Sequence, residues 1–294
     1  MLLGRYLNLV HQPCEMRCVN SFETKDGHKV PCGRCYNCCL NRVNGWAFRV
    51  DQHAKYNVYN GWFLLTYATC PRTPNNFRTL KTLDIQNFIK CLRRLEAKEY
   101  KPGETRMRVS YLMCGEYGTK NKRPHWHCFF FNLRNINNVQ LAWHHGFTTC
   151  DPTLTHGNIF YTLKYQFKDH SISRVGRFSD DDRMREKMLV SKNFGERYLT
   201  PAVKRFYLKE QNLEHSCFIQ VEDYKHPMPR YYRNKIYNDE QKERIYARQF
   251  ARIASLGREA KNRTEQQLLK DFESTKTKKR FSSKRIRKRY SIII

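Results

Sequence analysis

The chain carries Met107-Arg-Val-Ser-Tyr-Leu-Met-Cys114 and, after a polar segment from Gly115 to Pro124, Trp126-His-Cys-Phe-Phe-Phe131. Short apolar runs that are bounded by glycine and proline and rich in aromatic residues are typical of buried strands. Two glycines between the runs favour a reversal of the chain. The sequence therefore predicts an antiparallel hairpin with a long turn, and we expect its second strand to lie in the middle of a sheet.

Helices and strands surround this hairpin without regular βαβ alternation. Apolar residues recur at helical spacing in several segments, and Thr82 or Asp84 is suited to cap one of them. The mixture predicts an α+β fold with a central antiparallel sheet and flanking helices. We divide the chain into a Cys-rich module at 1–39, a main domain at 40–235 and a helical, basic extension at 236–294. The expected elements are helices over residues 40–56, 82–95, 138–144 and 158–168, a strand over 62–67, and a loop or insertion over 171–187.

The composition restricts the class of protein. Lys and Arg number 55 against 27 Asp and Glu, so the net charge is +28. Such an excess is typical of a protein that binds a polyanion, and nucleic acid is the leading candidate. No apolar run approaches the roughly 18–20 residues of a membrane-spanning helix, and we read no secretory signal at the N-terminus. We therefore expect no membrane partner and a location in the cytoplasm.

Two histidines in the second hairpin strand are candidate metal ligands. Alternate side chains of a strand share a face, so His125 and His127 point the same way. The partner strand ends near Glu116, whose carboxylate is a candidate third ligand. Imidazole and carboxylate together suit Mg or Mn in a phosphate-handling site, or zinc. The alternative is that both histidines are ordinary strand residues.

Two tyrosines in the predicted helix at 158–168 are candidate nucleophiles. Tyr161 and Tyr165 lie one helical turn apart on one face, and Lys164 lies close enough to favour a phenolate. A free tyrosine has a pKa of about 10, so nucleophilic attack at neutral pH requires such help. The alternative is that both rings belong to the apolar face of an amphipathic helix.

Six cysteines crowd the first 39 residues. The spacing Cys32-x2-Cys35-x2-Cys38, preceded by Cys14-x3-Cys18, offers five thiolates for a zinc ion that needs four. The Cys32-Gly-Arg-Cys35 turn resembles a zinc knuckle. Reduced thiols in a small packed module are the alternative, and the spacing is also compatible with an iron–sulfur cluster.

These motifs together resemble a known family. His125-Trp-His127 matches the His-hydrophobic-His motif of the HUH endonucleases, and Tyr161 with Tyr165 resembles their two-tyrosine nucleophile helix. The whole series, in order, is similar to the replication initiators of gokushovirus-type microviruses. The residues that carry this resemblance are Pro31–Cys38, Trp46, Arg49, Thr66-Tyr67, Cys114–Gly118, Arg123–His127, Tyr161–Tyr165, Ser191–Gly195 and Pro229–Tyr232.

The resemblance implies an enzyme of rolling-circle replication. Such enzymes bind single-stranded DNA at an origin, nick it through a tyrosine with the help of a metal ion, and later rejoin the strand. It implies Tyr161 and Tyr165 as nucleophiles, Lys164 as a phenolate-stabilising group, and a metal held by His125, His127 and Glu116. Host replication proteins are the implied partners, and the implied location is the host cell cytoplasm.

The C-terminal region is expected to contain a helix from Asp239 to about Asp271 and then a basic tail. The tail is interpreted as a DNA-tracking arm, a solvated charge run, or a nuclear localisation signal if the host is eukaryotic. Two other functions remain open: a non-catalytic single-stranded DNA binding or packaging protein, and an HUH transposase or relaxase. The basic residues of the tail, with no acid among them, are Lys276, Lys278, Lys279, Arg280, Lys284, Arg285, Arg287, Lys288 and Arg289.

Overall fold

The computed structural model describes residues 18, 20–25, 29–118, 120–163, 180–215, 218–221, 224–245 and 247–248. The chain divides into two compact units, Met1–Ile236 and Tyr237–Ile294. In the second unit, residues 239–245 and 247–248 are helical, where the long C-terminal helix was expected to begin. The rest of that helix and the whole basic tail lie outside the described residues. Within the described part of the chain, no helix has both the length and the apolarity to cross a membrane.

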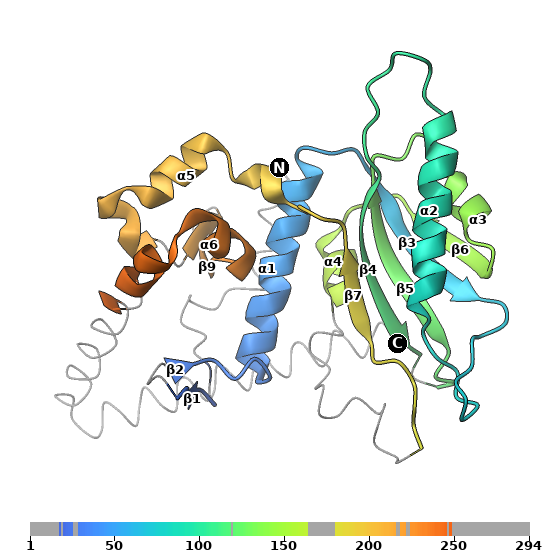
Figure 1. Cartoon of the computed structure of the whole chain (residues 1–294), viewed down its shortest axis with the longest axis horizontal. Coiled ribbons are helices and arrows are strands. Elements are labelled where there is room, and N and C mark those ends of the chain that lie inside the picture. The colour runs from blue at the N-terminus through green and yellow to red at the C-terminus, as the bar shows by residue number, and fades with distance from the viewer. Residues whose placement is uncertain are drawn as a thin grey trace. The chain divides into compact units, whose positions relative to one another are not determined.

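A five-stranded antiparallel sheet forms the centre of the first unit (Figure 1). The strand order is β6-β3-β5-β4-β7, so β5, which carries the two histidines, is the middle strand. This confirms the predicted α+β class and the predicted hairpin. The turn between β4 and β5 is shorter than expected, because both strands continue in register as far as the Tyr117–Pro124 pair. The strands are β3 (Tyr59–Tyr67), β4 (Ser110–Tyr117), β5 (Pro124–Phe131), β6 (Gly146–Asp151) and β7 (Lys187–Val190).

Helices cover both faces of this sheet, with α1 (Tyr36–Ala54) and α4 (His156–Leu163) on one face and α2 (Thr82–Lys98) and α3 (Asn138–Ala142) on the other (Figure 1). The alternation of side chains along β5 divides the core accordingly. Trp126, Cys128 and Phe130 are fully buried against the α2 side, whereas Phe129 and Phe131 are fully buried against the α1 side. His125 and His127 share the face of Phe129, so they lie on the side of α1 and α4.

Several boundaries differ from the sequence-based expectation. Helix α1 begins at Tyr36 rather than Leu40, because Cys35 acts as its N-cap residue. Helix α4 begins at His156 rather than Asn158, with Thr155 Oγ1 accepting a hydrogen bond from the Asn158 N–H at 3.0 Å. The end expected for this helix, residues 164–168, lies outside the described residues. The edge strands β6 and β7 were not expected, since β6 is largely exposed and β7 has four residues.

The remaining elements of the first unit are short. A two-residue ladder joins β1 (Phe22–Glu23) to β2 (Lys29–Val30), and β8 (Phe218–Val221) pairs with β9 (Tyr224–Pro227). Thr200 caps helix α5 (Pro201–Leu208) by accepting from the Val203 N–H at 3.2 Å. Helix α6 (Arg230–Ile236) and the 3₁₀ helices Glu196–Tyr198 and Glu210–His215 complete the set.

Three motif segments that are distant in sequence meet at Arg49, which is 7% exposed. Its Nε and Nη2 donate to the carbonyl oxygen of Phe194 at 3.2 and 2.7 Å. Its guanidinium lies over the rings of Trp46 and Tyr231, at 4.1 and 4.0 Å from their centroids. Tyr232 adds a hydrogen bond from its hydroxyl to the Gly195 carbonyl at 2.8 Å. The segments around α1, residue 194 and α6 are therefore joined through one guanidinium.

Candidate metal centre and nucleophile

Strand pairing brings three candidate ligands to one place. In the register of β4 and β5, Glu116 lies directly opposite His125, and Cys114 lies opposite His127. Directly opposite residues of an antiparallel pair, and the diagonal neighbours on the same face, come within side-chain reach. Glu116 therefore faces both imidazoles, as its position at the end of the predicted strand indicated.

The ligand atoms of this group converge. Glu116 Oε1 lies 3.1 Å from His125 Nε2 and 2.8 Å from His127 Nε2. One ligand atom from each residue lies within 4.8 Å of the others. Glu116 is 4% exposed and His127 is 2% exposed, whereas His125 is half-buried, so the group opens toward solvent on the side of His125. A cluster of one carboxylate and two imidazoles in this arrangement is suited to hold a divalent cation.

The backbone orients one of the imidazoles. The Nδ1 atom of His125 lies 3.1 Å from the carbonyl oxygen of Arg123, to which it donates when it is protonated. Metal-ligating histidines commonly make such a second hydrogen bond, because it fixes the tautomer and leaves the other nitrogen as the ligand. Arg123 is itself fixed, since its guanidinium donates to the carbonyl oxygen of Tyr67 at 2.5 Å. His125 Nε2 is thus directed at Glu116 before any ion binds.

Two aromatic side chains enclose His127. Trp62 of β3 stacks on its imidazole with ring centroids 5.5 Å apart and planes inclined by 20°. Tyr161 of α4 meets the same imidazole edge-on at 5.1 Å and the Trp62 ring at 6.2 Å. The Trp62 Nε1 donates to Thr162 Oγ1 at 2.8 Å, which joins β3 to α4. The candidate nucleophile Tyr161 is therefore held beside the candidate metal ligands.

Not every predicted site residue is within the described part of the chain. Of the three residues assigned to the nucleophile helix, Tyr161 is described, while Lys164 and Tyr165 lie outside the described residues. All nine basic residues of the tail, from Lys276 to Arg289, also lie outside them. The sequence did not single out the Trp62 side chain or Thr162. A tryptophan in a strand next to the histidine strand was the available signal.

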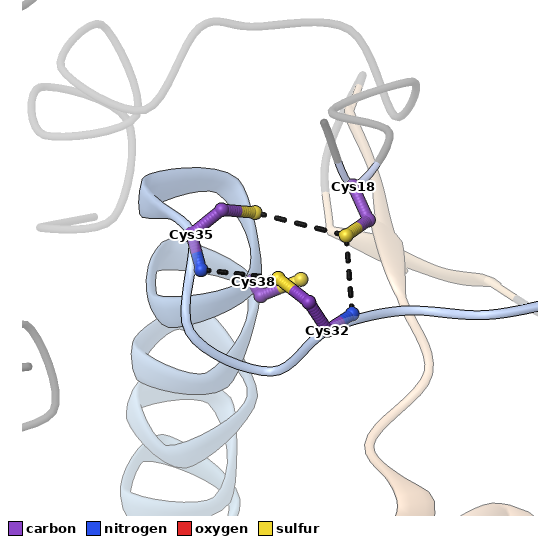
Figure 2. Close-up of side chains that lie close together, drawn as sticks. All are labelled: Cys18, Cys32, Cys35 and Cys38. Atoms are coloured by element: carbon purple, nitrogen blue, oxygen red, sulfur yellow. Dashed lines mark hydrogen bonds between the residues drawn. The ribbon is translucent and has the colours of Figure 1, made fainter. Parts of the chain in front are cut away.

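A second cluster lies at the start of α1 (Figure 2). The thiols of Cys18, Cys32, Cys35 and Cys38 all lie within 4.8 Å of one another. Backbone N–H groups of Arg34 and Cys35 donate to Cys32 Sγ at 3.4 and 3.3 Å, and they lower the pKa of Cys32 to about 6. Burial raises the pKa of Cys38. Cys14, the fifth candidate, lies outside the described residues.

Comparisons with known proteins agree with this arrangement. Residues 60–170 match a family model described as a replication-associated protein of the ORF2 type. This range contains β3, the β4–β5 hairpin and α4, and therefore all the residues around the candidate metal centre.

Three curated proteins are similar in sequence. Replication-associated protein ORF2 of Spiroplasma virus 4 is 28% identical over 204 residues, which cover 63% of this chain and 61% of that protein. Replication-associated protein ORF4 of Chlamydia phage 1 is 26% identical over 226 residues, covering 70% and 53%. Replication-associated protein VP4 of Bdellovibrio phage phiMH2K is 34% identical over 104 residues, covering 35% and 32%.

The matched segments thus span less than two thirds of each of these relatives. No solved structure matches the chain significantly. The family match and the three relatives agree with the motif series that runs from the cysteine turn to Tyr232. The chain is therefore a relative of the replication-associated proteins of microviruses, as its motifs predicted.

Proposed function

We propose that this protein initiates rolling-circle replication by nicking single-stranded origin DNA, as an endonuclease of the HUH type. The observation that carries the proposal is the convergence of Glu116, His125 and His127 beside the ring of Tyr161. A ligand set for a divalent cation and a hydroxyl nucleophile on one face of a sheet are what tyrosine-mediated phosphodiester transfer requires. The relatives' printed role in replication supports the same activity.

The chain's own residues prepare the site. The Arg123 carbonyl orients His125, the Trp62 ring supports His127, and Glu116 brings a negative charge to both. A bound Mg²⁺ or Mn²⁺ would polarise the scissile phosphate as a Lewis acid. Trp62 and Thr162 fix the part of α4 that carries the nucleophile.

The proposed reaction is a transesterification. The Tyr161 oxygen forms a bond to the phosphorus, its phenolic proton is lost to solvent, and the bond from phosphorus to the 3′-oxygen breaks. The departing 3′-oxygen takes up a proton to give a 3′-hydroxyl that a polymerase can extend. The 5′-phosphotyrosine link retains the energy of the phosphodiester, so a 3′-hydroxyl can later attack it and close the strand without ATP. Tyr165 would serve as the second nucleophile, and Lys164 would stabilise the phenolate.

The proposed substrate fits the charge of the chain. A net charge of +28 favours a polyanion, and the basic tail from Lys276 to Arg289 would add affinity without reading sequence. Origin single-stranded DNA is the proposed substrate, host replication proteins are the proposed partners, and the host cell cytoplasm is the proposed location.

A cleavage assay tests the proposal. Labelled single-stranded DNA from the cognate genome is incubated with and without Mn²⁺, using wild-type protein, Glu116→Gln and His127→Gln. We expect metal-dependent cleavage by the wild type and a loss of at least about 100-fold in each variant, because a ligand is removed. Gln140→Glu, an exposed change outside the cluster, is the control and should cleave normally. Tight DNA binding without cleavage at any metal would instead support a non-catalytic binding protein.

A further inference from the structure

We propose that Cys18, Cys32, Cys35 and Cys38 bind one structural zinc ion that caps the N-terminus of helix α1. This centre lies outside the β4–β5 cluster and has no part in the proposed cleavage chemistry. The sequence offered five thiolates and left open whether they bind metal. The structure assigns the set of four and the element that the ion would stabilise.

The separation of the sulfur atoms fits a tetrahedral tetrathiolate site. Zinc–sulfur bonds are about 2.3 Å long, so two sulfurs at the corners of such a tetrahedron lie about 3.8 Å apart. Cys18 Sγ and Cys35 Sγ are 3.8 Å apart, and every pair in the group lies within 4.8 Å. A small contraction of the group is therefore enough to bring all four thiolates to bonding distance of one ion.

The backbone of the cysteine turn supports thiolates rather than thiols. The N–H groups of Arg34 and Cys35 point at Cys32 Sγ, and the Cys32 N–H points at Cys18 Sγ at 3.1 Å (Figure 2). Gly33 makes this turn possible, because its φ of +71° is a conformation that residues with a side chain rarely adopt. Arg42 then holds the turn by donating to the Gly33 carbonyl at 2.6 Å.

Helix α1 begins without the usual N-terminal features. Its N-cap residue is Cys35, which makes no side-chain capping hydrogen bond, and its first turn has no acidic residue. Four thiolates around Zn²⁺ carry a net charge of −2, which is favourable beside the positive end of a helix dipole. Cys35 and Cys38 both lie at this end, so the proposed ion supplies the negative charge that the sequence of the first turn lacks.

The same ion would tie down a segment that has little else to hold it. Cys18 precedes the β1–β2 ladder, which has only two residues in each strand. A ladder this short is not stable on its own in water. Binding one ion through Cys18 and the α1 cysteines closes this segment onto the helix, in the way that structural zinc sites supply folding energy to small modules.

The neighbouring Cys39 provides a matched control. It is buried and adjacent to Cys38, yet its thiol donates to the Arg34 carbonyl at 3.4 Å and it is not a member of the converging group. Serine preserves a hydroxyl donor at that position. Cys39→Ser should therefore retain the metal, whereas Cys35→Ser should lose it, although the two cysteines lie in the same short segment.

The experiment measures zinc per chain in purified full-length wild type, Cys35→Ser and Cys39→Ser. We expect about one zinc in the wild type and in Cys39→Ser, and loss of that zinc in Cys35→Ser. Co²⁺ substitution of the wild type should give thiolate-to-metal charge-transfer absorption, which a site of histidine and carboxylate cannot produce. This second readout remains decisive if Cys35→Ser does not fold.

Three results would overturn the proposal. They are an unchanged zinc content in Cys35→Ser, iron in place of zinc in the wild type, and a metal-free wild type whose four thiols are alkylated or joined in disulfides. A chelator should also lower the melting temperature of the wild type and leave that of zinc-free Cys35→Ser unchanged. None of these readouts depends on DNA cleavage, so the inference stands or fails separately from the proposed function.

Discussion

The substitution Gly115→Ala should destabilise the sheet at the residue next to Glu116. A Cβ atom at Gly115 would lie 2.8 and 2.9 Å from two ring carbons of Trp126 and 3.0 Å from Leu80 Cδ2. Non-bonded carbons normally approach to about 3.5–4.0 Å, so the ring must move by roughly 0.5–1 Å. Trp126 is fully buried and has no room for this movement. Overpacking of this kind costs about 1–3 kcal/mol.

Gly45→Ala is the matched control, with the opposite sign. Gly45 lies within helix α1, and an added Cβ would meet the nearest atom, Pro229 Cγ, at 3.5 Å, which is ordinary contact. Replacing glycine by alanine inside a helix stabilises by about 0.5–1 kcal/mol when space permits. Both substitutions add one methyl group, so only the surroundings distinguish them.

Urea denaturation measures both variants. We expect the midpoint of Gly115→Ala to fall by about 0.5–1 M and that of Gly45→Ala to rise slightly. Movement of Trp126, which lies between His125 and His127 on β5, should also weaken Mn²⁺ binding in Gly115→Ala. A midpoint for Gly115→Ala equal to or above that of the wild type would refute the packing described for this strand pair.

Three further substitutions test other contacts. Trp62→Phe removes the donor to the buried Thr162 hydroxyl and should cost about 1–2 kcal/mol in urea unfolding while slowing DNA cleavage more than DNA binding. Burial first, and Arg197 and Arg49 next, lower the pKa of His53 to about 4. His53 is thus neutral in the folded protein, so stability should fall as the pH drops from about 6.5 to about 4, and His53→Gln should remove that slope. Arg49→Lys should lower stability by about 1–3 kcal/mol, as an ammonium cannot reproduce the planar stack between two rings, and an unchanged melting temperature would contradict this.

The centre of the fold could be predicted from the sequence because its signals are local. The period of two along a strand places His125 and His127 on one face whatever the rest of the chain does. The glycine-containing turn makes the hairpin, and the hairpin brings Glu116 opposite His125.

Contacts between distant segments could not be predicted in the same way. Trp62 reaches His127 only because β3 pairs with β5 in the register that sets Leu64 opposite His127, and no local pattern defines that register. The junction at Arg49 likewise depends on how α6 packs. The edge strand β6 was missed because its polar, exposed residues carry no apolar pattern.

The cysteine cluster shows an intermediate case. The spacing of the thiols indicated a metal site, but the sequence offered more ligands than the site needs. The position at which α1 begins determines that Cys35 and Cys38 join the converging group. Single-sequence patterns locate helix boundaries poorly, and here the boundary moved by four residues.

The measurement that tests the central claim most directly is the mapping of a covalent DNA adduct. Wild-type protein is incubated with single-stranded DNA from the cognate genome and Mn²⁺, denatured, digested and analysed by mass spectrometry. We predict a 5′-phosphotyrosine adduct on Tyr161 or Tyr165 that is absent without metal and absent from the variant carrying both Tyr161→Phe and Tyr165→Phe. A covalent adduct that persists in this double variant, or cleavage without any adduct in the wild type, would contradict the account.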